Sequence, residues 1–129
     1  SNSSLRIIEK QAFANSSIKK IDLPSSVTHI RSGAFINCDK LQRINIQSNS
    51  NLKVIEDRSF AYTPIEEFII PCHLTYIGDN VFHYCNKINI VEFDENSELT
   101  NIDLRIFCHT IVKTFMIPFK LAEHVNISF

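Results

Sequence analysis

Five of the ten phenylalanines in this 129-residue chain recur at an almost fixed interval. They are Phe13, Phe35, Phe60, Phe82 and Phe107, separated by steps of 22, 25, 22 and 25 residues. An isoleucine stands five residues before each of them, and a leucine or valine stands three residues before that isoleucine. A period of about 20 to 50 residues indicates a stack of similar units rather than a single irregular core. This repeat limits the possible folds more than any other feature of the sequence.

Downstream of each phenylalanine the unit ends in alternating apolar and polar residues, the pattern of a half-buried strand. We predict strands at Lys20–Leu23, Arg43–Ile46, Glu67–Ile70, Ile90–Phe93 and residues 114–117. Equivalent strands in a stack of units pair with one another, so we expect one parallel sheet. Short segments such as 28–30 and 75–77 predict a second, smaller ladder. The stretch around each phenylalanine predicts a single helical turn or a 3₁₀ segment.

The units come in two lengths that alternate. Residues 27–73 match residues 74–120 at 15 aligned positions, which indicates duplication of a pair of units. One unit cannot bury its apolar face alone, so the stack must fold together. We therefore predict a single domain over residues 1–129, made of five units of alternating 22 and 25 residues plus a partial sixth that contains His124 and Phe129. We expect the chain to be a fragment of a longer array.

The residues of the unit are specific enough to suggest a family. The skeleton [IF]-x-[LI]-P-x-x-[VL]-x-x-I-x-x-x-[AV]-F-x-x-C-x-x-[LI] occurs from Ile21 to Leu41 and again from Phe68 to Ile88. It resembles the BspA-type leucine-rich repeats of surface proteins from mucosal bacteria and parasitic protists. The resemblance implies a leucine-rich-repeat solenoid with a parallel β-sheet on one face and short helical turns or 3₁₀ segments and loops on the other. It also implies a protein-binding or adhesion module at a cell surface or in a secreted protein.

Charge and motifs argue against several other functions. Thirteen basic and 14 acidic residues give a net charge of −1 without a charged block, so we expect no nucleic-acid partner. No apolar run approaches the roughly 20 residues of a membrane span, so we expect no membrane insertion. The sequence contains no phosphate-binding loop and none of the common hydrolase motifs. We predict that the protein is not an enzyme and has no cofactor.

The four cysteines suggest packing rather than chemistry. His83 and Cys85 lie in one unit and Cys108 and His109 in the next, so a bridging metal is conceivable. However, Cys38 recurs at the repeat position of Cys85, which favours a small buried apolar site. We predict buried, reduced thiols and no metal. Two rungs separate Cys38 from Cys85, about 10 Å by strand spacing, which is too far for a disulfide.

The outward strand positions offer the best candidate for a binding surface. Ile69, Ile90 and Met116 fall where polar residues belong and lie on three consecutive strands. A contiguous apolar patch of this kind often marks a partner site. The remaining candidate residues on the same face are polar: Glu67, Glu92, Arg43 and Asn45.

The nature of the partner stays open at this point. The leading hypothesis is a protein partner, such as a host or matrix protein, bound by the sheet face and the adjoining loops. One alternative is a flanking domain or another copy of the chain that covers the patch, which would make the stack a structural spacer or a self-assembly element. The other is an intracellular scaffold with a cytoplasmic location. Three N-x-[ST] sequons, at Asn2, Asn15 and Asn126, give weak support to a secreted protein.

Overall fold

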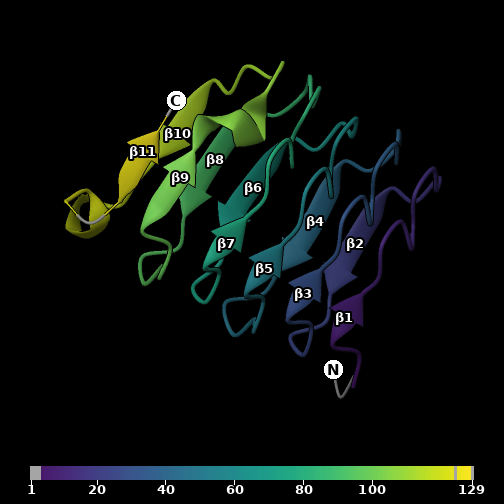
Figure 1. Cartoon of the computed structure of the whole chain (residues 1–129), viewed down its shortest axis with the longest axis horizontal. Coiled ribbons are helices and arrows are strands. Elements are labelled where there is room, and N and C mark those ends of the chain that lie inside the picture. The colour runs from purple at the N-terminus through teal and green to yellow at the C-terminus, as the bar shows by residue number, and fades with distance from the viewer. Residues whose placement is uncertain (1–3, 124, 129) are drawn as a thin grey trace.

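The computed structural model describes residues 4–123 and 125–128. The chain winds as a solenoid whose strands lie in two columns, with the two termini at opposite ends of the stack (Figure 1). His124 and Phe129, which we assign to the partial sixth unit, lie outside the described residues. Among the residues described, no helix has the length and apolar character needed to cross a membrane.

The longer strands carry the alternating segments and form the first column. They are β2 (Lys20–Leu23), β4 (Arg43–Ile46), β6 (Glu67–Ile70), β8 (Ile90–Phe93) and β10 (Thr114–Met116). Four of the five predicted ranges agree with the structure at both ends, and β10 ends one residue early. The ranges agree because apolar and polar residues alternate along each strand. This alternation places every second side chain in the core and decides which face of the strand is buried.

The prediction of one continuous sheet is wrong. β2 pairs with β4, and β6, β8 and β10 form a separate three-stranded parallel sheet. At the junction, the Glu66 N–H still donates to the Gln42 carbonyl at 3.3 Å, but β4 and β6 do not pair as strands. On its other side β6 pairs with β8 along its whole length, with Phe68 opposite Val91.

The second ladder is present and lies at the other edge of each rung. Its parallel strands are β1 (Ile7–Ile8), β3 (His29–Ile30), β5 (Val54–Ile55) and β7 (Tyr76–Ile77), followed by a separate pair made of β9 (Asn101–Asp103) and β11 (Asn126–Ser128). The helical segments are short: η1 (Leu104–Phe107) and η2 (Phe119–Leu121) are 3₁₀ turns. Around the four earlier phenylalanines the chain forms turns rather than 3₁₀ helix.

The repeated phenylalanines form a column through the core, as predicted. Successive rings from Phe13 to Phe107 are stacked with centroids 5.3, 5.3, 5.9 and 5.7 Å apart. Each ring is also held by its backbone, because the Phe35 N–H donates to Ser59 and the Phe60 N–H to Val81 on the next rung. Stacking and backbone bonding therefore join the same pairs of rungs.

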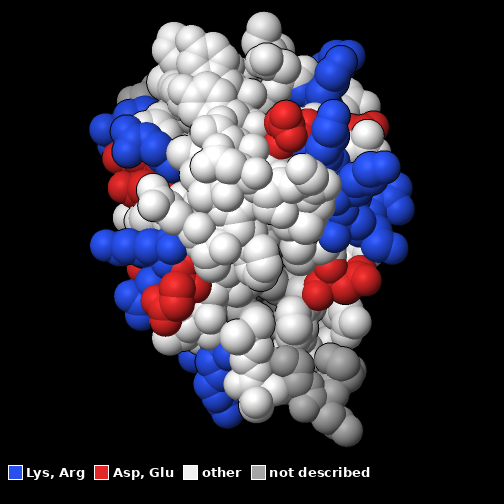
Figure 2. All heavy atoms as spheres, turned by 90° about the vertical axis from the view of Figure 1, so that its right-hand side faces the viewer, with Lys and Arg blue, Asp and Glu red and all other residues white. Residues whose placement is uncertain are grey.

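The column is buried in the middle of the stack and open at its N-terminal end. Phe35 and Phe60 are fully buried, whereas Phe13 on the first rung is 40% exposed. Viewed from this end, uncharged atoms fill the centre of the molecule and charged side chains lie to both sides (Figure 2). The first rung thus presents apolar surface along the solenoid axis.

Position in the stack leads to a prediction for stability. Phe60→Ala removes a buried ring with a stacked neighbour on both sides, and we expect a loss of about 3–5 kcal/mol in the free energy of unfolding. Phe13→Ala removes a half-exposed ring with one stacked neighbour, and we expect a clearly smaller loss. Urea denaturation followed by circular dichroism measures both. Equal losses for the two variants would contradict the role assigned to the column.

Candidate functional site

The predicted binding residues all lie on the outward face of the first strand column. Ile69 and Met116 are 48% and 50% exposed. Ile90 is half-buried. The four polar candidates lie on the same face, with Glu67 and Arg43 exposed and Asn45 and Glu92 half-buried.

Strand register sets the arrangement of the three apolar residues. Ile69 pairs with Glu92 of β8, which in turn pairs with Met116 of β10. Ile90 stands in the next row, between Glu67 and Thr114. The apolar side chains therefore follow a zigzag across three strands, with the carboxylate of Glu92 between Ile69 and Met116. A partner surface that fits this face needs both apolar groups and a hydrogen-bond donor or a cation.

A shallow groove lies where β4 and β6 separate. Its walls contain four of the seven predicted residues, namely Arg43, Asn45, Glu67 and Ile69. The Asn45 amide is held from the neighbouring strand, because its Nδ2 donates to Asp22 Oδ1 at 2.6 Å. The sheet face thus carries a groove at the break between β4 and β6. Ile90, Glu92 and Met116 lie beyond this groove on β8 and β10.

Sequence reasoning missed a second exposed feature, a stack of aromatic rings at one corner of the solenoid. Tyr62 and Tyr84 are 44% and 41% exposed, and their rings stack with centroids 5.5 Å apart. His109 continues the stack, 4.9 Å from Tyr84. We call Tyr62, Tyr84 and His109 the aromatic corner. Exposed tyrosines combine a large apolar ring with a polar hydroxyl, a combination enriched in binding interfaces.

The backbone at this corner makes the choice of residues unusual. All three have positive φ, at 60°, 53° and 56°, and the equivalent residues of the first two rungs are Asn15 and Asn37. Asparagine tolerates this left-handed conformation, whereas bulky residues adopt it at a cost. Backbone strain of this kind is often found at functional sites. The signal was present in the sequence, since the position two residues after each phenylalanine changes from Asn to Tyr or His along the chain.

The cysteines singled out for a bridging metal do not come together. Cys85 is buried, and its Sγ–H donates to the carbonyl of Phe60 at 3.1 Å. Among the described residues, neither Cys85 nor Cys108 belongs to a group of three possible metal ligands. Cys38 makes the equivalent bond to Phe13 at 3.0 Å. The repeat position is therefore a buried hydrogen-bond donor as well as a small packing site. Outside the core, His83 and His109 contact each other through their rings, 5.3 Å between centroids.

All four cysteines are free thiols. Burial and nearby charges raise the pKa of three of them, Cys38, Cys72 and Cys85. Burial is the main cause that raises the pKa of Cys38 and of Cys85 above the usual value. The pKa of half-buried Cys72 is also raised, first by desolvation and then by the negative charges of Asp94 and Glu98. A raised pKa lowers the fraction of reactive thiolate at neutral pH.

The geometry defines a leucine-rich-repeat solenoid with a groove on its sheet face. The BspA type leucine rich repeat region matches residues 2–129 in six copies. The chain therefore belongs to the BspA-type leucine-rich repeat family. A search of curated protein sequences gives no match.

Solved structures of repeat proteins from bacteria share the fold. The pneumococcal vaccine antigen PcpA superposes with a TM-score of 0.73 at 27% identity, over 87% of this chain and 32% of PcpA. A leucine-rich cell surface protein of Faecalibacterium prausnitzii A2-165 gives 0.56 at 23% identity, over 92% of this chain and 40% of that one. The leucine-rich repeat protein of T. pallidum gives 0.58 at 19% identity, over 89% and 68%. The chain thus spans about a third of the length of PcpA.

Thiol accessibility gives a test of the site description. We expect a thiol reagent such as Ellman's reagent to modify Cys72 and Cys108, which are half-buried, well before Cys38 and Cys85. The buried pair should react only at the rate at which the stack opens. Mass spectrometry of peptides after timed labelling measures the order. Early labelling of Cys85 would contradict its placement in the core.

Proposed function

We propose that this chain is a protein-binding module of the adhesion type that uses the sheet face formed by β4, β6, β8 and β10. The observation that carries the proposal is the pair of half-exposed apolar side chains on this face. Ile69 lines a groove together with Arg43, Asn45 and Glu67, and Met116 lies beyond the groove on β10. Solenoids offer extended surfaces of this kind to other macromolecules. Buried apolar anchors with polar residues around them are the usual composition of a protein interface.

A location at the cell surface is part of this proposal. It is supported by family membership and by the structural likeness to proteins described as a vaccine antigen and as a cell surface protein. Those proteins are longer than this chain, so their own partners and activities are not carried over. The partner class that we propose is a host or extracellular-matrix protein.

The alternative function is self-assembly, and specific exposed residues favour it as the second candidate. Ile111 is 86% exposed and Phe119 is 97% exposed, and they stand five residues before and three residues after Met116 in the chain. Apolar side chains exposed to this degree are covered in many proteins by a further domain or by a second copy. In that case the stack would serve as a structural spacer, and association would depend on protein concentration.

A binding experiment with paired variants tests the proposal. Ile69→Asp combined with Met116→Asp places charges on two half-exposed positions, and we expect binding to fall at least tenfold, equivalent to about 1.4 kcal/mol. The measurement uses surface-immobilised matrix proteins and intact epithelial cells, with circular dichroism as the check on folding. Affinity unchanged in a folded double variant would remove the sheet face from consideration.

Matched controls separate the two candidate surfaces and the two candidate functions. Tyr62→Asn combined with Tyr84→Asn restores the residue found at this corner in the first two rungs. Loss of binding in this variant alone would place the partner on the aromatic corner instead. Light scattering over a range of concentrations shows whether the wild-type chain self-associates. Association abolished by the Asp substitutions, without binding to any other protein, would favour self-assembly.

A further inference from the structure

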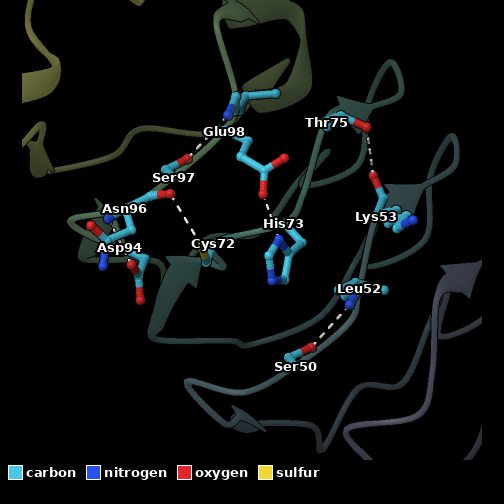
Figure 3. A network of polar contacts seen from close by, with 11 residues as sticks. Ser50, Leu52, Lys53, Cys72, His73, Thr75, Asp94, Asn96, Ser97 and Glu98 are labelled. Carbon is cyan, nitrogen blue, oxygen red and sulfur yellow. Dashed lines mark hydrogen bonds and ion pairs between the residues drawn. The ribbon is translucent and has the colours of Figure 1, made fainter.

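Two neighbouring loops bring three potential metal ligands together at the ends of β6 and β8. Cys72 and His73 follow β6, and Glu98 lies in the loop after β8 (Figure 3). Their ligand atoms, one from each residue, all lie within 4.8 Å of one another. Within the described residues this is where Cys, His and carboxylate side chains gather in such a group. The sequence interpretation discounted metal binding after considering other cysteines.

We propose that Cys72, His73 and Glu98 form a zinc site, with Cys72 Sγ, His73 Nδ1 and a carboxylate oxygen of Glu98 as the protein ligands. Zinc prefers this combination of sulfur, nitrogen and oxygen donors in tetrahedral geometry. Its bond lengths place ligand atoms about 3.3 to 3.8 Å apart. Small side-chain rotations therefore suffice to close the group around the ion, and water fills the fourth position.

Backbone hydrogen bonds join the two loops and hold the ligand residues next to one another. The Glu98 N–H donates to the Cys72 carbonyl at 2.8 Å, and the Asp94 N–H donates to Ile70 at 2.9 Å. The His73 and Glu98 side chains are 48% and 52% exposed and now share a 2.5 Å contact between Nδ1 and Oε2. Zinc takes the place of the proton in this contact, and the exposed carboxylate turns outward by about 1 Å to admit it. The Cys72 thiol releases its proton to solvent as it becomes a thiolate ligand, and so gives up its hydrogen bond to Asn96.

The surroundings of the group favour a cation. Asp94 adds a second carboxylate whose charge acts on Cys72 together with that of Glu98. Cys72 Sγ lies 3.2 Å from the carbonyl oxygen of Asn96, so the thiol already points toward the second loop (Figure 3). The two loops therefore bring together the thiol of Cys72, the carboxylates of Asp94 and Glu98, and the imidazole of His73.

The duplicated half of the chain provides an internal comparison. A shift of 47 residues aligns Cys72, His73 and Glu98 with Ser25, Ser26 and Asn51. The loop backbone is the same in both halves, since the Asn51 N–H donates to the Ser25 carbonyl at 3.0 Å. Ser50 and Ser97 also make equivalent bonds to the N–H groups of Leu52 and Leu99. The fold therefore does not require the three ligands, and they occur together in one half only.

Cobalt provides a spectroscopic probe because a thiolate ligand gives a charge-transfer band in the near ultraviolet. The experiment uses the chain without an affinity tag of histidines, reduced and stripped of metal with a chelator. We expect one Co²⁺ per chain, a thiolate band, and displacement of Co²⁺ by Zn²⁺. The variant Cys72→Ser, His73→Ser, Glu98→Asn copies the loop of the other half and should fold normally. We expect this variant to lose at least about 100-fold in affinity, the upper end of the loss seen for a second-shell change.

Two controls make the result decisive. Cys108→Ser removes the other half-buried thiol and should leave the cobalt spectrum unchanged. Cys72→Ser alone should abolish the thiolate band. The absence of saturable Co²⁺ or Zn²⁺ binding by the wild-type chain would overturn the proposal and leave the group as a polar contact between loops. Binding of equal strength in the triple variant would also overturn it, because the ion would then be held elsewhere.

Discussion

The contact between one rung and the next is the interaction on which the rest of this structure depends. Each rung is too small to bury its own apolar residues, so its stability comes from its neighbours. Two kinds of contact join the same rungs: stacked rings in the phenylalanine column, and backbone bonds such as that from Phe60 to Val81. Because the rings stack at an almost constant distance, equivalent residues fall into rows on the surface. The sheet-face candidates and the aromatic corner are formed by such rows. Cys72, His73 and Glu98 come together from the loops of neighbouring rungs.

The surface is uneven because the rows are not uniform. In the first strand column, β4 and β6 do not pair, and the groove at this break is lined by four of the candidate residues. At the aromatic corner, Asn15 and Asn37 give way to Tyr62, Tyr84 and His109. In the loops after β6 and β8, serine and asparagine give way to Cys72, His73 and Glu98. Each departure changes one patch of the surface and leaves the core repeat intact, which is how a repeat protein acquires specific sites.

Much of the fold could be predicted because the repeat determines it. The alternation in Glu67–Ile70 fixed both the strand and its outward residues, and the period of the phenylalanines predicted the column. The candidate site was predicted less completely. Alignment of the repeats already places Ile69, Glu92 and Met116 in one outward row, and the strand register agrees with it. The groove between β4 and β6 and the exposed aromatic corner were not predicted. Both depend on how side chains from adjacent rungs are arranged, which no single segment specifies.

The sequence by itself determined the solenoid, the order of its strands and the residues of its core, because local periodicity decides which side chains face inward. The tertiary structure alone decided which loop residues from different rungs meet. Cys72 and Glu98 are separated by 26 positions in the chain, yet a backbone bond between the two residues places them side by side. The groove between β4 and β6 likewise joins residues of two different rungs. Such contacts depend on the size and rotation of side chains across the stack, and a linear pattern contains neither.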